Sequence, residues 1–170
     1  MTNKQGEFIW YELMTTDIEA ARAFYGAVVG WTISDRSDMP GMDYRMIRAA
    51  DGDVAGLMAL DDEMIAGGGR PIWVGYIGVE DVDAIAAAIP SMGGKIYVPP
   101  QDIPGVGRFA MAADPHGAPF YIMRGSVEGG VSRSFSADAL GHCSWNELSS
   151  PDQKTALNFY MGLFGWTNPS

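Results

Sequence analysis

Along this chain, segments with strand-like hydrophobic patterns and segments with helix-like patterns follow one another in an order that repeats. Residues 8–14 are rich in aromatic and aliphatic side chains, which favours a β-strand. From Ile18 to Val28, apolar residues recur every three or four positions, which predicts an amphipathic helix whose buried face holds Ile18, Ala21, Phe24, Tyr25 and Val28. Three strand-like segments follow, and turn residues separate them. We expect these strands at residues 33–35, 44–49 and 54–60. The order strand, helix and three strands predicts a βαβββ module at residues 6–62.

A weaker version of the same order begins at Pro71. A strand is expected at residues 72–79 and a helix at 81–89. Three further strands are expected at residues 95–98, 107–113 and 119–124. The pattern therefore predicts a second βαβββ module at residues 70–125.

The opening of the first module occurs again near the end of the chain. Residues 10–32 read WYELMTTDIEAARAFYGAVVGWT, and residues 145–167 read WNELSSPDQKTALNFYMGLFGWT. The offset is 135 residues without a gap, and ten of the 23 positions are identical. The repeat predicts a further strand and helix within residues 140–170, after a Gly- and Ser-rich linker at 126–139. We expect Thr16 and Ser150 to cap the two helices.

These residues resemble the vicinal oxygen chelate superfamily, which includes glyoxalases, bleomycin resistance proteins and dioxygenases. The likeness lies in the W-x-E-L opening, the A-x-x-F-Y and G-W motifs, and the stretch from Gly93 to Phe120. It implies an α+β fold in which paired βαβββ modules form a cupped half-barrel sheet. Residues 6–125 would be one complete domain, and residues 140–170 the first strand and helix of a second, truncated domain.

Composition excludes several classes of partner. The net charge of −10 would repel a phosphate backbone, so we expect no nucleic-acid binding. No apolar run is long enough for a membrane span, and the first residues do not resemble a signal peptide. Cys143 is the single cysteine, which rules out an intrachain disulfide and fits a reducing compartment. We therefore expect a cytoplasmic protein without a membrane partner.

The resemblance also implies where a divalent metal would be held. The family's ligands come from the first strand of each module and from a late strand. The matching positions here are Trp10, Val74 and Trp145 on the opening strands and Tyr121 on the late strand, and none is a histidine or a carboxylate. We therefore predict no metal ligands and no cofactor. A metal held by carboxylates and water is the alternative.

Strand alternation places Trp10 and Glu12 on the same face of the first strand. By the resemblance, this face is the one that lines the ligand site. Val74, Tyr76 and Tyr121 would join Trp10 as ligand-binding residues. Burial would raise the pKa of Glu12 and suit it to act as a general base. The alternative is that Glu12 has a structural role.

These expectations favour a glyoxalase- or bleomycin-resistance-like protein that binds a small aromatic or apolar molecule without a metal. One alternative is a metal-dependent enzyme, either a glyoxalase-type lyase or a ring-cleaving dioxygenase. Another is a metal-independent enzyme that uses Glu12 as its base. The last alternative is a scaffold that becomes complete with a missing C-terminal half or with a second subunit of a homodimer.

Overall fold

The computed structural model describes residues 3–126 and 130–169, and the chain divides into two compact units. The first-module unit, as we call it, contains residues 10–75 and 133–145. The second-module unit contains residues 1–9, 76–132 and 146–170. Each unit thus combines most of one predicted module with segments from distant parts of the sequence.

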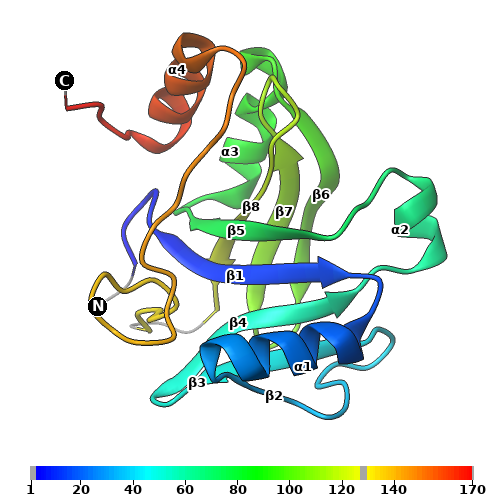
Figure 1. Ribbon diagram of the computed structural model, residues 1–170. Coiled ribbons are helices and arrows are strands. Elements are labelled where there is room, and N and C mark those ends of the chain that lie inside the picture. The colour runs from blue at the N-terminus through cyan, green and yellow to red at the C-terminus, as the bar shows by residue number, and fades with distance from the viewer. Residues whose placement is uncertain (1–2, 127–129, 170) are drawn as a thin grey trace. The chain divides into compact units, whose positions relative to one another are not determined.

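The first-module unit contains a mixed sheet in the order β2-β3-β4-β1. Its elements are β1 (Phe8–Thr15), α1 (Ile18–Val29), β2 (Thr32–Ile33), β3 (Tyr44–Ala49), β4 (Gly52–Ala59) and α2 (Asp62–Ala66). Strand β1 runs parallel to β4, whereas β3 is antiparallel to both β2 and β4. Helix α1 lies against this sheet (Figure 1) and buries Ile18, while Ile47 and Leu57 are fully buried sheet residues.

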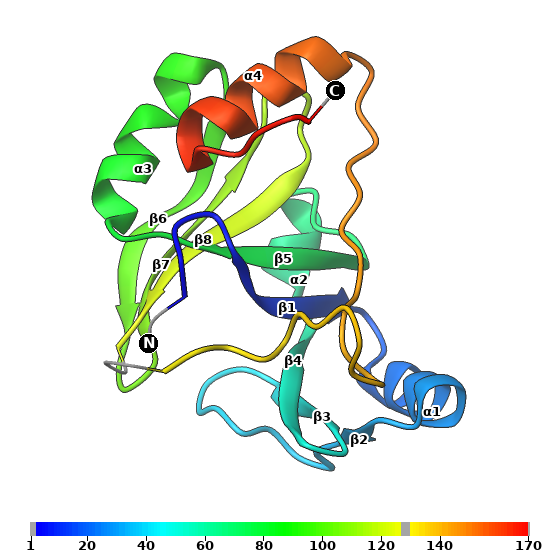
Figure 2. The ribbon, with the colours of Figure 1, turned by 90° about the vertical axis from the view of Figure 1, so that its left-hand side faces the viewer.

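The second-module unit contains strands in the order β5-β8-β7-β6. Its elements are β5 (Ile72–Gly78), α3 (Val82–Ala88), the 3₁₀ helix η1 (Pro90–Met92), β6 (Lys95–Ile103), β7 (Gly107–Ala113), β8 (Pro119–Gly125) and α4 (Gln153–Phe164). Strand β5 is parallel to β8, and the other two pairs are antiparallel. Figures 1 and 2 both show α4 beside α3, and both helices contribute to one core with Phe120 and Ile122 of β8.

The order of elements in both modules agrees with the prediction, and the α+β class is confirmed. The helix starts differ from the expected ones. Asp17, not Thr16, caps α1, and its side chain accepts from the Ala20 amide at 2.9 Å. Asp152, not Ser150, caps α4 in the same way. Each aspartate lies in extended backbone directly before the first helical residue, where its carboxylate reaches an otherwise unpaired amide. The short helix α2 was not predicted.

The predicted strand before α4 does not form. Cys143 makes one isolated bridge to Phe135, and residues 144–149 are not a β-strand. The matching strand of the first copy, β1, pairs in parallel with β4. The division into domains 6–125 and 140–170 stays a prediction, and residues 127–129 of the linker lie outside the described residues.

Among the described residues, no helix has both the length and the hydropathy needed to cross a bilayer.

Candidate functional site

The candidate site in the first-module unit starts from Glu12 on β1. Glu12 is buried, with only 2% of its surface exposed. Glu12 lies opposite Gly56 in the parallel β1–β4 ladder. A Cβ atom at Gly56 would lie 1.9 Å from the hydroxyl oxygen of Tyr44, so the phenol occupies the space that a side chain would take. Gly56 therefore lets Tyr44 of β3 reach across β4 toward β1.

Tyr44 bonds Trp10 and lies near enough to Glu12 to feel its charge. The indole Nε1–H of Trp10 donates to the Tyr44 hydroxyl oxygen at 3.0 Å. Burial raises the pKa of Tyr44 above its ordinary value, and the negative charge of Glu12 raises it further. The bond from Trp10 has a smaller, opposite effect on this pKa. Tyr44 therefore stays a neutral phenol at physiological pH and keeps its O–H as a donor. We call these three residues the Trp10–Glu12–Tyr44 cluster.

This cluster combines two aromatic faces with groups that can select a polar ligand atom. A buried carboxylate accepts hydrogen bonds and can accept a proton, whereas a phenol can donate. The aromatic rings supply flat apolar surface. The cluster is thus suited to holding a flat molecule that carries hydroxyl or carbonyl groups.

The other predicted ligand-binding residues lie in two places. Tyr76 of β5 and Tyr121 of β8 are paired in register, and their buried rings stack with centroids 4.1 Å apart. Val74 is fully buried in the first-module unit. The structure therefore brings Trp10 close to Glu12 and Tyr76 close to Tyr121. A shared role for these two pairs, which belong to different units, stays a prediction.

Sequence reasoning missed Tyr44 as a site residue. It was expected to lie in a strand, but the face on which it points depends on how β3 is aligned with β4. The signal that could have found it is Gly56, an isolated glycine within an otherwise apolar strand. Such a glycine often marks the close approach of another group.

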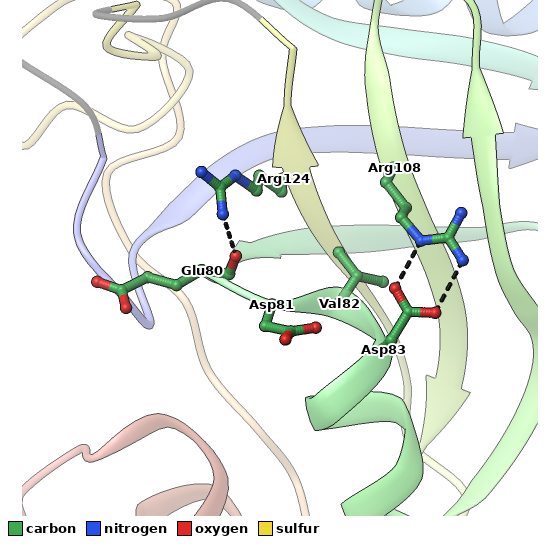
Figure 3. A pocket seen from close by; sticks show the side chains of 6 residues that line it. All are labelled: Glu80, Asp81, Val82, Asp83, Arg108 and Arg124. Atoms are coloured by element: carbon green, nitrogen blue, oxygen red, sulfur yellow. Dashed lines mark hydrogen bonds and ion pairs between the residues drawn. The ribbon is translucent and has the colours of Figure 1, made fainter.

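A second polar site lies at the start of α3 in the second-module unit (Figure 3). The guanidinium of Arg108 bonds both carboxylate oxygens of Asp83, at 2.7 and 2.8 Å, and also contacts Asp102. This pairing lowers the pKa of Asp83. Arg124 donates to the backbone carbonyl of Glu80. Because these arginines already have protein partners, the site ties α3 to the sheet and offers little for a ligand.

The fold and the sequence together define the family. The model of the Glyoxalase/Bleomycin resistance protein/Dioxygenase superfamily matches residues 7–122, and the chain belongs to this superfamily. It is 41% identical over 124 residues to the protein named "Putative glyoxylase CFP32" of Mycobacterium tuberculosis, covering 73% of this chain and 46% of that protein. It is 30% identical to the anthracycline biosynthesis protein DauV of Streptomyces sp. strain C5, covering 92% of this chain and 59% of that protein. The chain thus spans about half the length of these relatives.

Solved structures show the same fold at low sequence identity. The Mn(II)-bound glyoxalase of Novosphingobium aromaticivorans matches with a TM-score of 0.62 and 20% identity, over 96% of this chain and 54% of that one. A methylmalonyl-CoA epimerase of Streptomyces coelicolor matches with a TM-score of 0.52 and 20% identity, over 73% of this chain and all of that one. These likenesses support the α+β glyoxalase fold predicted from the sequence.

The described residues do not form the divalent metal site that the resemblance implies. The described residues include no group of three or more His, Cys, Asp or Glu side chains that could hold an ion. His142 is occupied elsewhere, since its Nε2 lies 2.8 Å from a carboxylate oxygen of Asp51. His116 lies in the turn that Asp114 organises through the His116 amide. The prediction that the protein uses no metal cofactor remains to be tested.

Proposed function

We propose that the protein binds a flat aromatic or apolar small molecule, without a metal, at the Trp10–Glu12–Tyr44 cluster. The observation that carries this proposal is the hydrogen bond from Trp10 to Tyr44 beside the buried Glu12. It holds two aromatic side chains in fixed positions next to a carboxylate. Preorganised aromatic surface binds flat ligands well, because little side-chain freedom is lost on binding. Val74, Tyr76 and Tyr121 stay proposed ligand-binding residues.

Two relatives support the ligand class. DauV of Streptomyces sp. and DnrV of Streptomyces peucetius are both named anthracycline biosynthesis proteins. Anthracyclines are fused-ring aromatic compounds that carry hydroxyl and carbonyl groups. The Trp10–Glu12–Tyr44 cluster offers the stacking surface and the hydrogen-bonding groups that such a compound requires.

The proposal can be tested by titrating the protein with a dihydroxyanthraquinone while following tryptophan fluorescence. We expect saturable quenching, and Trp10→Leu should weaken binding by about tenfold or more, as is typical when a central aromatic anchor is removed. Trp145→Leu is the matched control, because Trp145 is an exposed tryptophan. Equal affinity of the two variants would show that Trp10 is not part of the site.

The metal-free part of the proposal needs a separate measurement. The protein is incubated with Zn(II), Ni(II), Mn(II) or Fe(II), dialysed, and analysed for bound metal by mass spectrometry. We expect far less than one ion per chain, and no change in anthraquinone affinity upon adding a chelator. Near-stoichiometric metal would instead favour the lyase and dioxygenase alternatives.

A second candidate function is a metal-independent enzyme in which Glu12 removes a proton from a carbon acid. The burial of Glu12 beside a phenol that keeps its proton favours it, because this pair combines a base with a donor to a carbonyl oxygen. Anthrone, a flat molecule with an acidic C–H group, is a suitable probe. We expect the protein to accelerate deuterium incorporation from D₂O, followed by NMR, and Glu12→Gln to abolish this while retaining anthrone binding. Exchange no faster than in buffer would exclude this role for anthrone-like acids.

A further inference from the structure

Side chains attach residues 133–145 to the rest of the first-module unit at two neighbouring positions. The indole Nε1–H of Trp31, which follows α1, donates to the carbonyl oxygen of Gly141 at 2.7 Å. The imidazole of the next residue, His142, contacts Asp51 in the turn between β3 and β4. Two consecutive residues therefore hold this segment against two separate parts of the unit.

Both ring nitrogens of His142 face oxygen atoms that accept hydrogen bonds. Nε2 lies 2.8 Å from a carboxylate oxygen of Asp51, and Nδ1 contacts the backbone carbonyl oxygen of Arg133. A neutral imidazole has one N–H donor and one acceptor nitrogen, so it can satisfy only one of these contacts. The imidazolium ion has two N–H donors and satisfies both. The arrangement therefore requires the protonated ring.

The charges around the ring favour the same state. The side chain of His142 is only 2% exposed, and the carboxylate of Asp51 faces it from the β3–β4 turn. The guanidinium of Arg133 contacts the other oxygen of that carboxylate. The hydrogen bond from His142 lowers the pKa of Asp51 below its ordinary value, and the positive charge of Arg133 adds to this effect. Asp51 therefore stays ionised throughout the pH range in which a histidine titrates.

We propose that His142 acts as a pH-dependent clasp, which holds residues 133–145 against the β3–β4 turn as imidazolium and releases them when it loses one proton to water. In the neutral ring, one bare nitrogen would face a carbonyl or carboxylate oxygen, and a buried acceptor without a donor is costly. Gly141 is joined directly to His142, so its bond to Trp31 breaks in the same movement. The clasp is independent of the proposed ligand site.

The direction of the pH effect follows from the protonated form. A histidine in an unfolded chain titrates near pH 6.5. The stability that the clasp provides is therefore fully present below about this pH, and it is lost as the pH rises and the ring gives up its proton. Because one proton is involved, the ratio of released to attached segment should increase by at most about tenfold per pH unit.

Nuclear magnetic resonance can follow the proton and the segment in the same protein. Labelling with ¹⁵N-histidine shows which ring nitrogens carry a proton, and 5-fluorotryptophan reports on Trp31. Trp31→Phe and His142→Gln assign the two signals. Below pH 6 we expect both ring nitrogens of His142 to be protonated. As the pH is raised to 9, the Trp31 signal should change with the same midpoint as His142, because its bond to Gly141 is lost.

Two aspartates of the same hairpin provide a variant and its matched control. Asp51→Asn removes the anion beside the ring, so it should lower the common midpoint by about one pH unit or more. Asp53→Asn removes the same charge from a residue that instead pairs with Arg48, at 2.6 Å, and should leave the midpoint nearly unchanged.

Three results would overturn the proposal. The first is a His142 ring with one unprotonated nitrogen in the folded protein below pH 6. The second is a His142 titration that leaves the Trp31 signal unchanged. The third is an equal effect of Asp51→Asn and Asp53→Asn on the midpoint. The first two are measured on the unaltered sequence, so they decide the matter even if a variant does not fold.

Discussion

At the scale of single residues, the candidate site depends on Gly56, which has no side chain. Gly56 leaves room for the Tyr44 phenol, and the phenol then reaches Trp10 and the neighbourhood of Glu12. Alternation along one strand was enough to place Trp10 and Glu12 on a common face. It could not place Tyr44, because a β-bulge between Ile47 and Arg48 shifts the β3–β4 register, and the sequence does not reveal this shift.

Gly56→Ala tests this arrangement. The new methyl group would overlap the Tyr44 hydroxyl, so we expect a loss of about 1–3 kcal/mol in the free energy of unfolding, the usual cost of overpacking. The loss should shrink in a Tyr44→Ala background, which removes the clash. Gly125→Ala is the control, because a methyl group there meets nothing within 4 Å. Urea denaturation measures all four variants, and an undiminished loss in the Tyr44→Ala background would disprove the close approach.

The ionisation of Tyr44 gives a prediction about alkaline pH. In the unfolded chain a tyrosine titrates near pH 10, and the pKa of Tyr44 is raised above this value in the folded protein. The stability that the neutral phenol provides is therefore fully present below about pH 10 and is lost as the pH rises further. Glu12→Gln removes a negative charge near the phenol, so it should lower the pKa of Tyr44.

Ultraviolet absorbance at 295 nm follows the phenolate form of the seven tyrosines. Tyr44→Phe should remove one tyrosine from the most alkaline part of the titration curve. Glu12→Gln should shift that tyrosine's ionisation to lower pH. Tyr160 also has a raised pKa, from burial and the charge of Asp114, so late signal should persist in Tyr44→Phe. An unchanged curve in Glu12→Gln would place its carboxylate away from Tyr44.

At the scale of whole elements, periodicity predicted both copies of the repeated helix. The predicted buried face of the first copy is wrong for Phe24 and Val28, which are 58% and 65% exposed. Whether an apolar helix face is covered depends on a partner far away in the sequence, which periodicity does not reveal. In α4 the partner is the second-module sheet, whereas Phe24, Val28 and Val29 of α1 stay exposed. Two helices with the same pattern therefore differ in how much each contributes to stability.

Phe159→Ala and Phe24→Ala test this difference with the same substitution at equivalent positions. Phe159 is fully buried, so its truncation should cost about 3–5 kcal/mol in the free energy of unfolding. Phe24 is mostly exposed, so its truncation should stay within about 0.5–1 kcal/mol. Thermal or urea unfolding of both variants under the same conditions gives the comparison. Similar losses for the two variants would mean that Phe24 is buried in solution.

At the scale of the whole molecule, the order of elements and the family could be predicted, whereas the composition of the two units could not. Residues 133–145 belong to the first-module unit, and residues 146–170 belong to the second. Such exchanges depend on long-range contacts such as that between Trp166 and Gly6, which no local pattern reveals. The repeat related two segments that are far apart in the sequence. It showed that their local structures are alike, but not which residues each copy contacts.

Removing residues 150–170 tests whether α4 is part of the second-module core. In the intact chain α4 covers Phe120 with five buried residues: Ala156, Phe159, Tyr160, Leu163 and Phe164. Without α4 this face would meet water, and each large apolar side chain uncovered costs about 1.5–3 kcal/mol. We expect a lower unfolding midpoint and several-fold stronger fluorescence of 8-anilinonaphthalene-1-sulfonate, which binds exposed apolar surface.

Phe24→Ser in the intact chain is the control, because it changes an exposed residue of α1 and leaves α4 packed against Phe120. If the shortened chain keeps its unfolding midpoint and binds no more dye, the second-module unit is complete without α4. The helix would then be an attached segment that the second-module unit does not need. If the unfolding midpoint of the shortened chain falls, α4, which belongs to the second repeat copy, completes the core of the second-module sheet.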